Sequence, residues 1–226
     1  MNVNSDLGER AGHDEEILRF IDSANVCCGA HAGSATDSIE TANRCRELGV
    51  EVGAHPGYDD RENFGRVEVP LSPSDIDALI RFQVGALAAV TRLAYIKPHG
   101  ALYHHLQAHP EAAELLARIA AEYDIGVMGQ PGFAILAAAQ KVGVKAYREA
   151  FADRAYLPDG RLAPRSQPGS VLEPDQAAEQ ALRLARSGEC DTICLHGDSP
   201  GAPATARRIR EALDEADIQT GPLASH

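Results

Sequence analysis

The segment SATDSIETANRCRELGVEVGAHPG, residues 34–57, predicts a helix followed by a short strand. Residues 34–48 have the spacing of an amphipathic helix, with Ser34 or Thr36 as its N-cap and Gly49 at its end. Residues 50–55 form an apolar run that ends in His55, and Pro56-Gly57 terminates it. A helix leading into a strand is the repeating unit of parallel α/β proteins.

The same unit recurs along the rest of the chain. Six further apolar runs predict strands at 2–6, 23–28, 94–98, 125–128, 144–150 and 192–196. Further helices are predicted at 14–21, 73–93, 110–123, 133–141, 174–187 and 204–216, with a tail at 218–226. This alternation indicates parallel strands with right-handed crossovers. We therefore expect a single α/β domain over residues 1–226, a seven-stranded (β/α) barrel.

Polar or ionisable residues stand at nearly every predicted strand end. They are Asp6, Asn25 to His31, His55, Lys97 and His99, Glu149 to Arg154, and His196 with Asp198. Barrel enzymes carry their catalytic groups at this rim. The structural alternative is an open doubly wound sheet, which would concentrate such residues at one switch point. No G-x-G-x-x-G follows the first strand, so the barrel is favoured.

Several strand-end residues suggest specific chemistry. Asp6 could bind a metal, orient a histidine, act as a base or simply cap a turn. His31 lies in a glycine-rich loop, where backbone can approach a ligand closely. Lys97 and His99 share one face of their strand. An inward ammonium at Lys97 requires an anion, either a site carboxylate, a substrate carboxylate or a phosphate.

The last two strand ends leave alternatives open. Arg154 could clamp a carboxylate or phosphate, or an ion pair with Asp153 could pin the loop that follows. His196 and Asp198 could form an acid–base pair, a ligand with its supporting group, or an ordinary turn. Asp6, His31 and His55 could together bind a divalent metal, although no local H-x-x-x-H pattern anchors one. S-x-x-K, G-x-S-x-G and Walker A patterns are absent from the sequence.

Composition excludes some classes of function. The chain has 226 residues, 44% of them hydrophobic, and a formal net charge of -12, which disfavours nucleic-acid binding. No apolar run is long enough to cross a membrane. Five cysteines without a secretory leader indicate a reducing, cytoplasmic setting, and Cys190 and Cys194 are expected to be core thiols. His104 and His105 are expected on a solvent-facing turn, and His13, His109 and His226 receive no role.

The motifs together resemble the LamB/YcsF family. They are Asn4-x-Asp6-Leu-Gly-Glu9, Asn25-x-x-Cys28-Gly29-x-His31-Ala-Gly33, Gly53-Ala-His55-Pro-Gly57-Tyr58, Phe64-Gly-Arg66, Lys97-Pro-His99-Gly-Ala-Leu-Tyr103, Glu149-x-Phe-Ala-Asp153-Arg154-x-Tyr156 and Cys194-x-His196-Gly-Asp198. They run in the family's order over nearly the whole chain.

The resemblance implies a barrel related to the glycoside hydrolase/deacetylase barrels. It also implies ATP-dependent, nucleotide-binding hydrolysis of a cyclic amide, 5-oxo-L-proline, to L-glutamate by a 5-oxoprolinase that contains two partner subunits, B and C. Carried onto this chain, the catalytic residues are Asp6, His31, His55, Lys97, His99, Glu149 and His196. The substrate-binding residues are Asn25, Arg66, Asp153, Arg154 and Asp198. No phosphate loop is recognisable, so ATP is expected on a partner subunit or at an interface.

The chain departs from the family pattern at several positions. Ala30 stands where the family usually has Phe, and Ser34 where it usually has Asp. Ala30 is expected to widen the pocket beside His31. Two alternatives remain open: a non-catalytic binding subunit, and a metal-dependent deacetylase or amidohydrolase on the same barrel. The sequence also leaves a homo-oligomer open.

Overall fold

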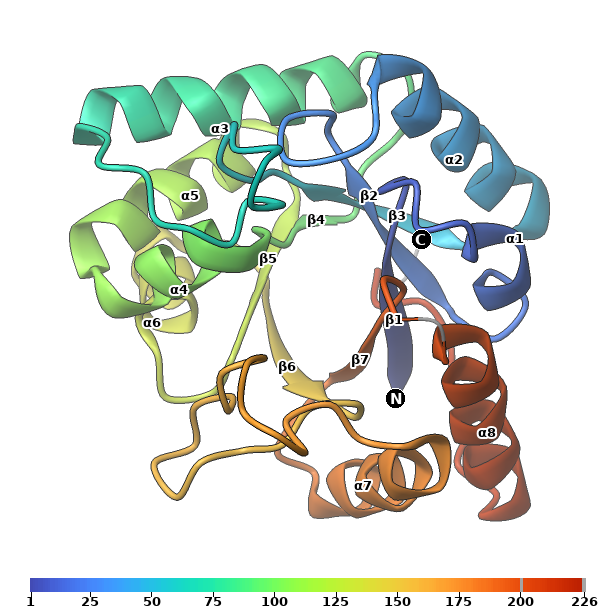
Figure 1. Cartoon of the computed structure of the whole chain (residues 1–226). Coiled ribbons are helices and arrows are strands. Elements are labelled where there is room, and N and C mark those ends of the chain that lie inside the picture. Colours follow the sequence, from blue (N-terminus) through green and yellow to red (C-terminus); the bar gives the residue numbers. More distant parts are fainter. Residues whose placement is uncertain (200, 225–226) are drawn as a thin grey trace.

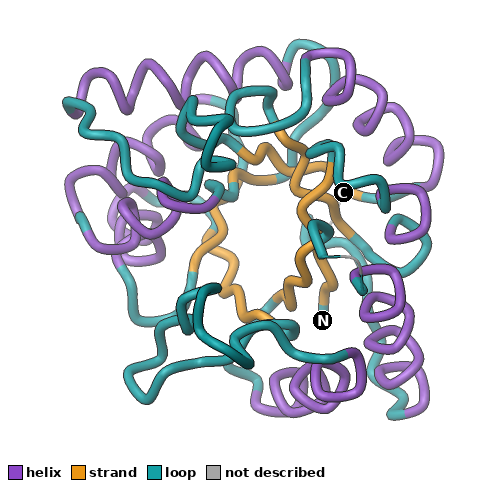
Figure 2. Tube along the Cα trace, in the orientation of Figure 1, coloured by secondary structure: helices purple, strands orange, loops and turns teal. Residues whose placement is uncertain are grey.

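Seven parallel strands form a closed barrel in the computed structural model, which describes residues 1–199 and 201–224. They are β1 (Asn2–Leu7), β2 (Ser23–Cys27), β3 (Glu51–His55), β4 (Tyr95–Ile96), β5 (Gly126–Gly129), β6 (Ala146–Phe151) and β7 (Thr192–His196). Each strand pairs with its neighbour in sequence, and β7 pairs with β1. Figures 1 and 2 show the strands as a ring inside a layer of helices. The predicted seven-stranded (β/α) barrel is therefore confirmed, and the open sheet is excluded.

The helices surround the barrel. They are α1 (Asp14–Ile17), α2 (Ala35–Leu48), α3 (Pro73–Ala88), α4 (Gly100–Ala108), α5 (Pro110–Glu122), α6 (Ala134–Val142), α7 (Pro174–Ser187) and α8 (Ala202–Glu215). Ser34 caps α2 by accepting a hydrogen bond from the Asp37 amide, and Gly49 ends it with φ of 70°. Within residues 1–199 and 201–224, no helix combines the length and apolar character needed to span a bilayer.

Helix α4 corrects a prediction, because His104 and His105 were expected on a turn. Leu102, Tyr103 and Leu106 are buried at helical spacing, and they hold this segment against the core. His104 is exposed as expected, whereas His105 is half-buried.

Two other predicted elements were too long, and part of the predicted tail cannot be judged. The helix predicted to end at residue 93 ends at Ala88. The strand predicted at 94–98 is reduced to Tyr95–Ile96, since the chain leaves the sheet at Lys97-Pro98 and proline has no amide hydrogen to donate. Residues 225–226 of the predicted tail, including His226, lie outside the described residues.

The apolar core lies between the barrel and the helices. Successive side chains of a strand point to opposite faces, so Val3 and Leu7 point outward and are fully buried beneath the helical layer. Ile80 of α3, Leu116 of α5 and Ile209 of α8 belong to the same cluster. Burial of side chains of this size contributes about 1.5–3 kcal/mol each.

The inside of the barrel is polar near β1. Asn2 and Asn4 point inward, together with Asp6, and they bond to neighbouring strands. Thr192 Oγ1 donates to Asn2 Oδ1 (2.6 Å) and accepts from Asn4 Nδ2 (2.7 Å). Asn25 Nδ2 donates to Asn4 Oδ1 (2.7 Å) and to Asp6 Oδ1 (2.8 Å). A one-residue slip of β1 would turn these groups toward the helices, so they fix its register.

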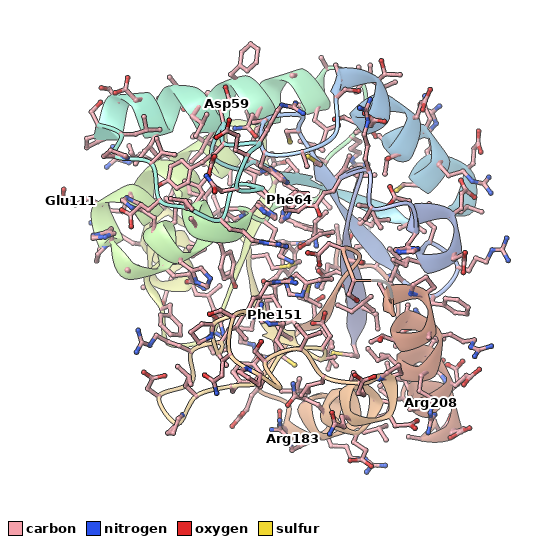
Figure 3. All side chains as sticks on the ribbon, in the orientation of Figure 1. Asp59, Phe64, Glu111, Phe151, Arg183 and Arg208 are labelled. Carbon is pink, nitrogen blue, oxygen red and sulfur yellow. The ribbon has the colours of Figure 1, made fainter. Side chains whose placement is uncertain are left out.

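Strand register places the functional ends at one side of the barrel. Asp6 is paired with Asn25 on β2 and with His196 on β7. Two long connections, 56–72 and 152–173, lie over this end (Figure 1). Figure 3 places Phe64 and Phe151 toward the middle of this face, whereas Glu111, Arg183 and Arg208 lie at its periphery.

Candidate active site

A cavity of about 370 Å³ opens where the strands end. Strands or residues directly after them contribute Asp6, His55, Lys97, His99, Phe151 and His196, while the long connections contribute Arg66, Arg154 and Arg165. Its volume lies in the range of pockets that bind small molecules. The cavity is therefore the place where strand-end chemistry can meet a ligand.

Lys97 lies at the centre of a buried charge network. Its side chain is 3% exposed, and Nζ lies 2.8 Å from Asp6 Oδ1 and 3.0 Å from Glu149 Oε1. Nζ also contacts Cys194 Sγ at 2.9 Å. Burial alone would lower the pKa of Lys97, but the two carboxylates outweigh it and raise the pKa well above its ordinary value. Lys97 therefore remains an ammonium group.

The two carboxylates beside Lys97 differ in their proton affinity. Burial raises the pKa of Asp6, but His55 and Lys97 outweigh it and hold that pKa well below its ordinary value. Burial dominates at Glu149, whose pKa is raised even though Lys97 opposes the shift. Tyr103 donates its hydroxyl to Glu149 Oε2 at 2.9 Å. Asp6 is therefore an ionised group facing the cavity, whereas Glu149 binds a proton more readily.

Three imidazoles and Glu9 form a second cluster, called here the imidazole cluster. Glu9 Oε1 lies 3.0 Å from His31 Nε2, 3.3 Å from His99 Nδ1 and 3.7 Å from His55 Nε2. The His31 and His99 rings are stacked, with centroids 3.8 Å apart. Burial opposes ionisation of Glu9, but hydrogen bonds from His31 and His99 outweigh it and lower its pKa. A buried carboxylate is thus kept ionised by imidazoles.

Glycines allow the imidazoles to pack this closely. A Cβ atom at Gly57 would lie 2.4 Å from His31 Nδ1. A Cβ at Gly65 would lie 2.7 Å from His31 Cβ, and φ at this residue is +64°. The glycine motifs that follow β3 are therefore explained by the space that the His31 ring needs.

His196 and Asp153 form an oriented pair on the wall contributed by β7. His196 Nδ1 donates to Asp153 Oδ1 at 3.0 Å, and the His196 amide donates to Oδ2 at 2.9 Å. Burial raises the pKa of Asp153, but His196 outweighs it and the net shift is downward. An imidazole held through Nδ1 by a carboxylate presents Nε2 for proton transfer.

Three arginines line the outer part of the cavity. Arg66 pairs with Asp198, and Arg165 lies 3.3 Å from Asp198 Oδ1. Arg154 donates to the backbone oxygens of Ser170 (3.2 Å) and Ala163 (2.6 Å) and thereby fastens the connection after β6. Burial, followed by the positive charge of Arg165, lowers the pKa of Arg154. Three guanidinium groups around one carboxylate favour an anionic ligand.

The predicted site residues fall into two groups. Those that line the cavity are Asp6, His55, Arg66, Lys97, His99, Arg154 and His196. Those that stand behind a lining residue and contact it or its neighbours are Asn25, His31, Glu149, Asp153 and Asp198. Asn25 holds Asp6 from inside the barrel and also accepts from Tyr95. Ser34, a departure from the family pattern, serves as a helix cap.

Sequence reasoning missed Glu9, Tyr103 and the contact of Cys194. Glu9 follows Asp6 by three residues, and its place directly after a strand end was the available signal. Cys194 is buried as expected, but it stands two residues before His196 on the inward face. Of the predicted metal ligands, His31 and His55 share the imidazole cluster, whereas Asp6 reaches only its His55 side at 3.4 Å.

Comparison with known proteins matches this chain over its whole length. The A subunit of 5-oxoprolinase from Neisseria meningitidis serogroup C is 41% identical, with 97% of this chain and 98% of that protein covered. The crystal structure of a lactam utilization protein from Thermus thermophilus superposes with a TM-score of 0.90 at 38% identity, covering 98% of each chain.

A more distant neighbour shares only the fold. The family 4 carbohydrate esterase from Streptomyces lividans in complex with acetate has a TM-score of 0.58 at 11% identity, covering 99% of this chain and 92% of that one. The LamB/YcsF family matches residues 1–226. The chain therefore belongs to the LamB/YcsF family.

Proposed function

We propose that the barrel mouth hydrolyses a small cyclic amide, 5-oxo-L-proline, to L-glutamate. The observation that carries the proposal is the convergence, in one cavity, of the oriented His196–Asp153 pair with arginines on the outer wall. The names of the two similar proteins, a 5-oxoprolinase component and a lactam utilization protein, support the same substrate class.

The cavity has groups suited to both parts of such a substrate. The substrate carboxylate would pair with Arg66 or Arg165, which can bind it through two parallel hydrogen bonds. The lactam ring would then lie deeper, between His196 and the Lys97 side of the cavity. The apolar face of Phe151 stacks on the His196 ring, with centroids 5.5 Å apart, and it would restrict the position of the ring.

The reaction adds water across the amide bond. His196 Nε2 would accept a proton from water as its oxygen bonds to the ring carbonyl carbon. When the carbon–nitrogen bond breaks, the same imidazolium would return that proton to the nitrogen and form the amine of glutamate. Asp153 stabilises the transient imidazolium, and Lys97 holds Asp6 and Glu149 in place throughout.

ATP would act through partner subunits. A five-membered lactam is an unstrained amide, so coupling to ATP hydrolysis would supply the driving force for ring opening. The Neisseria relative is named as one of several subunits of its enzyme, which supports an assembly, and we assign nucleotide binding to subunits B and C. We further propose that the assembly works in the cytoplasm.

The test is glutamate release from 5-oxo-L-proline by this chain reconstituted with subunits B and C and ATP. We expect His196→Gln to lower kcat by at least about 100-fold, the lower range for a general acid–base group. His109→Gln, which alters an exposed histidine on the outer layer, should retain activity. Glutamate release unaffected by His196→Gln would support the non-catalytic alternative, and no release by any combination would overturn the proposed reaction.

A further inference from the structure

We propose that Glu9, His55 and His99 form a binding site for one divalent transition-metal ion, with an open position toward the cavity. The three donor atoms are Glu9 Oε1, His55 Nε2 and His99 Nδ1. They come from the turn after β1, the end of β3 and the residue that precedes α4.

Backbone carbonyls fix which nitrogen of each imidazole is free. His55 Nδ1 donates to the Lys97 carbonyl at 2.6 Å, so its Nε2 carries the lone pair when the ring is neutral. His99 Nε2 donates to the Phe64 carbonyl at 2.9 Å, so its Nδ1 carries the lone pair. These two free nitrogens lie 3.0 Å apart. Two lone pairs that face each other at this distance require a cation between them.

The donor spacing matches a metal site. Zinc bonds of about 2.0–2.1 Å at tetrahedral angles would place any two donor atoms roughly 3.3–3.4 Å apart. The three separations among Glu9, His55 and His99 are 3.0, 3.3 and 3.7 Å. Backbone hydrogen bonds to the far nitrogens are the usual supports of metal-binding histidines.

The charge balance points the same way. Among residues 1–199 and 201–224, Glu9 has no Lys or Arg within 4.0 Å, and its ionic partners are imidazoles. Lys97 is already shared between Asp6 and Glu149. A metal ion would therefore compensate a buried carboxylate that no permanent cation reaches. Two imidazoles and one carboxylate suit ions such as Zn²⁺ better than Mg²⁺, which prefers oxygen ligands.

His31 has a different role in this proposal. Its ring is parallel to that of His99, with an angle of 4° between the planes. A metal in the plane of the His99 ring therefore lies outside the plane of the His31 ring, where His31 has no lone pair. We assign His31 as the donor that orients Glu9 at 3.0 Å.

The open position would serve the reaction. His55 and His99 line the cavity, whereas Glu9 lies behind them. An ion held there would polarise a carbonyl oxygen or a water molecule in the cavity. This catalytic part rests on the proposed function, but the binding of the ion does not.

Calorimetric titration of chelator-treated protein with Zn²⁺, without substrate or partner subunits, tests the site. We expect one ion per chain, an affinity reduced by more than about 100-fold in His55→Gln and His99→Gln, and a smaller loss in His31→Gln, of roughly 10- to 100-fold. His104→Gln removes a histidine that lines the same cavity but lies outside the cluster, so it should bind Zn²⁺ like the unchanged protein. Mg²⁺ should not compete.

Two outcomes would overturn the site, and a second measurement is independent of variants. An unchanged protein that binds no Zn²⁺ would mean that a shared proton joins His55 and His99. Equal Zn²⁺ affinity in His99→Gln would also refute the assignment. If the variants do not fold, anomalous scattering from a Zn²⁺-soaked crystal of the unchanged protein decides, with the ion expected between Glu9, His55 and His99. Because no glutamate is measured, failure here leaves the ring-opening proposal to its own test.

Discussion

Replacing Lys97 with Met should destabilise the fold strongly, because the ammonium group neutralises two buried carboxylates. Lys97 Nζ lies 2.8 Å from Asp6 and 3.0 Å from Glu149, and its side chain is 3% exposed. Removal of one partner from a buried ion pair costs about 3–5 kcal/mol, since the remaining charge has no counterion. For a chain of this length that corresponds to a decrease in Tm of roughly 6–20 °C.

Urea denaturation followed by circular dichroism would measure the change in the free energy of unfolding. Lys141→Met is the matched control, because Lys141 is 67% exposed and its ion pair with Glu114 lies in solvent; it should change stability little. Adding Glu149→Gln to Lys97→Met removes one uncompensated charge and should restore about 1 kcal/mol or more. A loss below about 1 kcal/mol in Lys97→Met would refute the view that Lys97 organises the buried network.

Two further predictions concern other parts of the site. Gly57→Ala places a methyl group 2.4 Å from His31 Nδ1 and should lower stability by about 1–3 kcal/mol, whereas Gly221→Ala, with no neighbour within 4 Å, should not; comparable Tm values would contradict this. The pKa of Asp153 is lowered in the fold, so its stabilising effect is present above its unfolded pKa of about 3.9 and is lost as the pH falls through the folded value. Asp153→Asn should therefore lose less stability than the unchanged protein between about pH 4 and pH 2, and equal losses in acid titrations would exclude this role.

The barrel could be predicted because each strand announces itself locally. The helix at 34–48 and the strand ending in His55 were placed within one residue of α2 and β3. Parallel pairing then requires all strand ends to meet on one side, which brought His55, Lys97 and His196 to one cavity. Local pattern and chain topology were thus sufficient for the outline of the site.

The finer contacts depend on tertiary structure that local patterns do not encode. Glu9 lies on an irregular turn, and its three imidazole partners are between 22 and 90 residues away. Whether Arg154 would bind a ligand or the backbone depended on the path of its loop, which supplies the carbonyls of Ala163 and Ser170. Helix α4 was missed because a glycine with φ of +51°, Gly100, begins it directly after His99.

A crystal structure of the chain with 5-oxo-L-proline bound would test the central claim most directly. The account predicts the ring beside His196, with its carboxylate on Arg66 or Arg165. Binding instead in the surface pocket lined by Arg10 and Arg44, with the barrel mouth empty at saturating ligand, would contradict it.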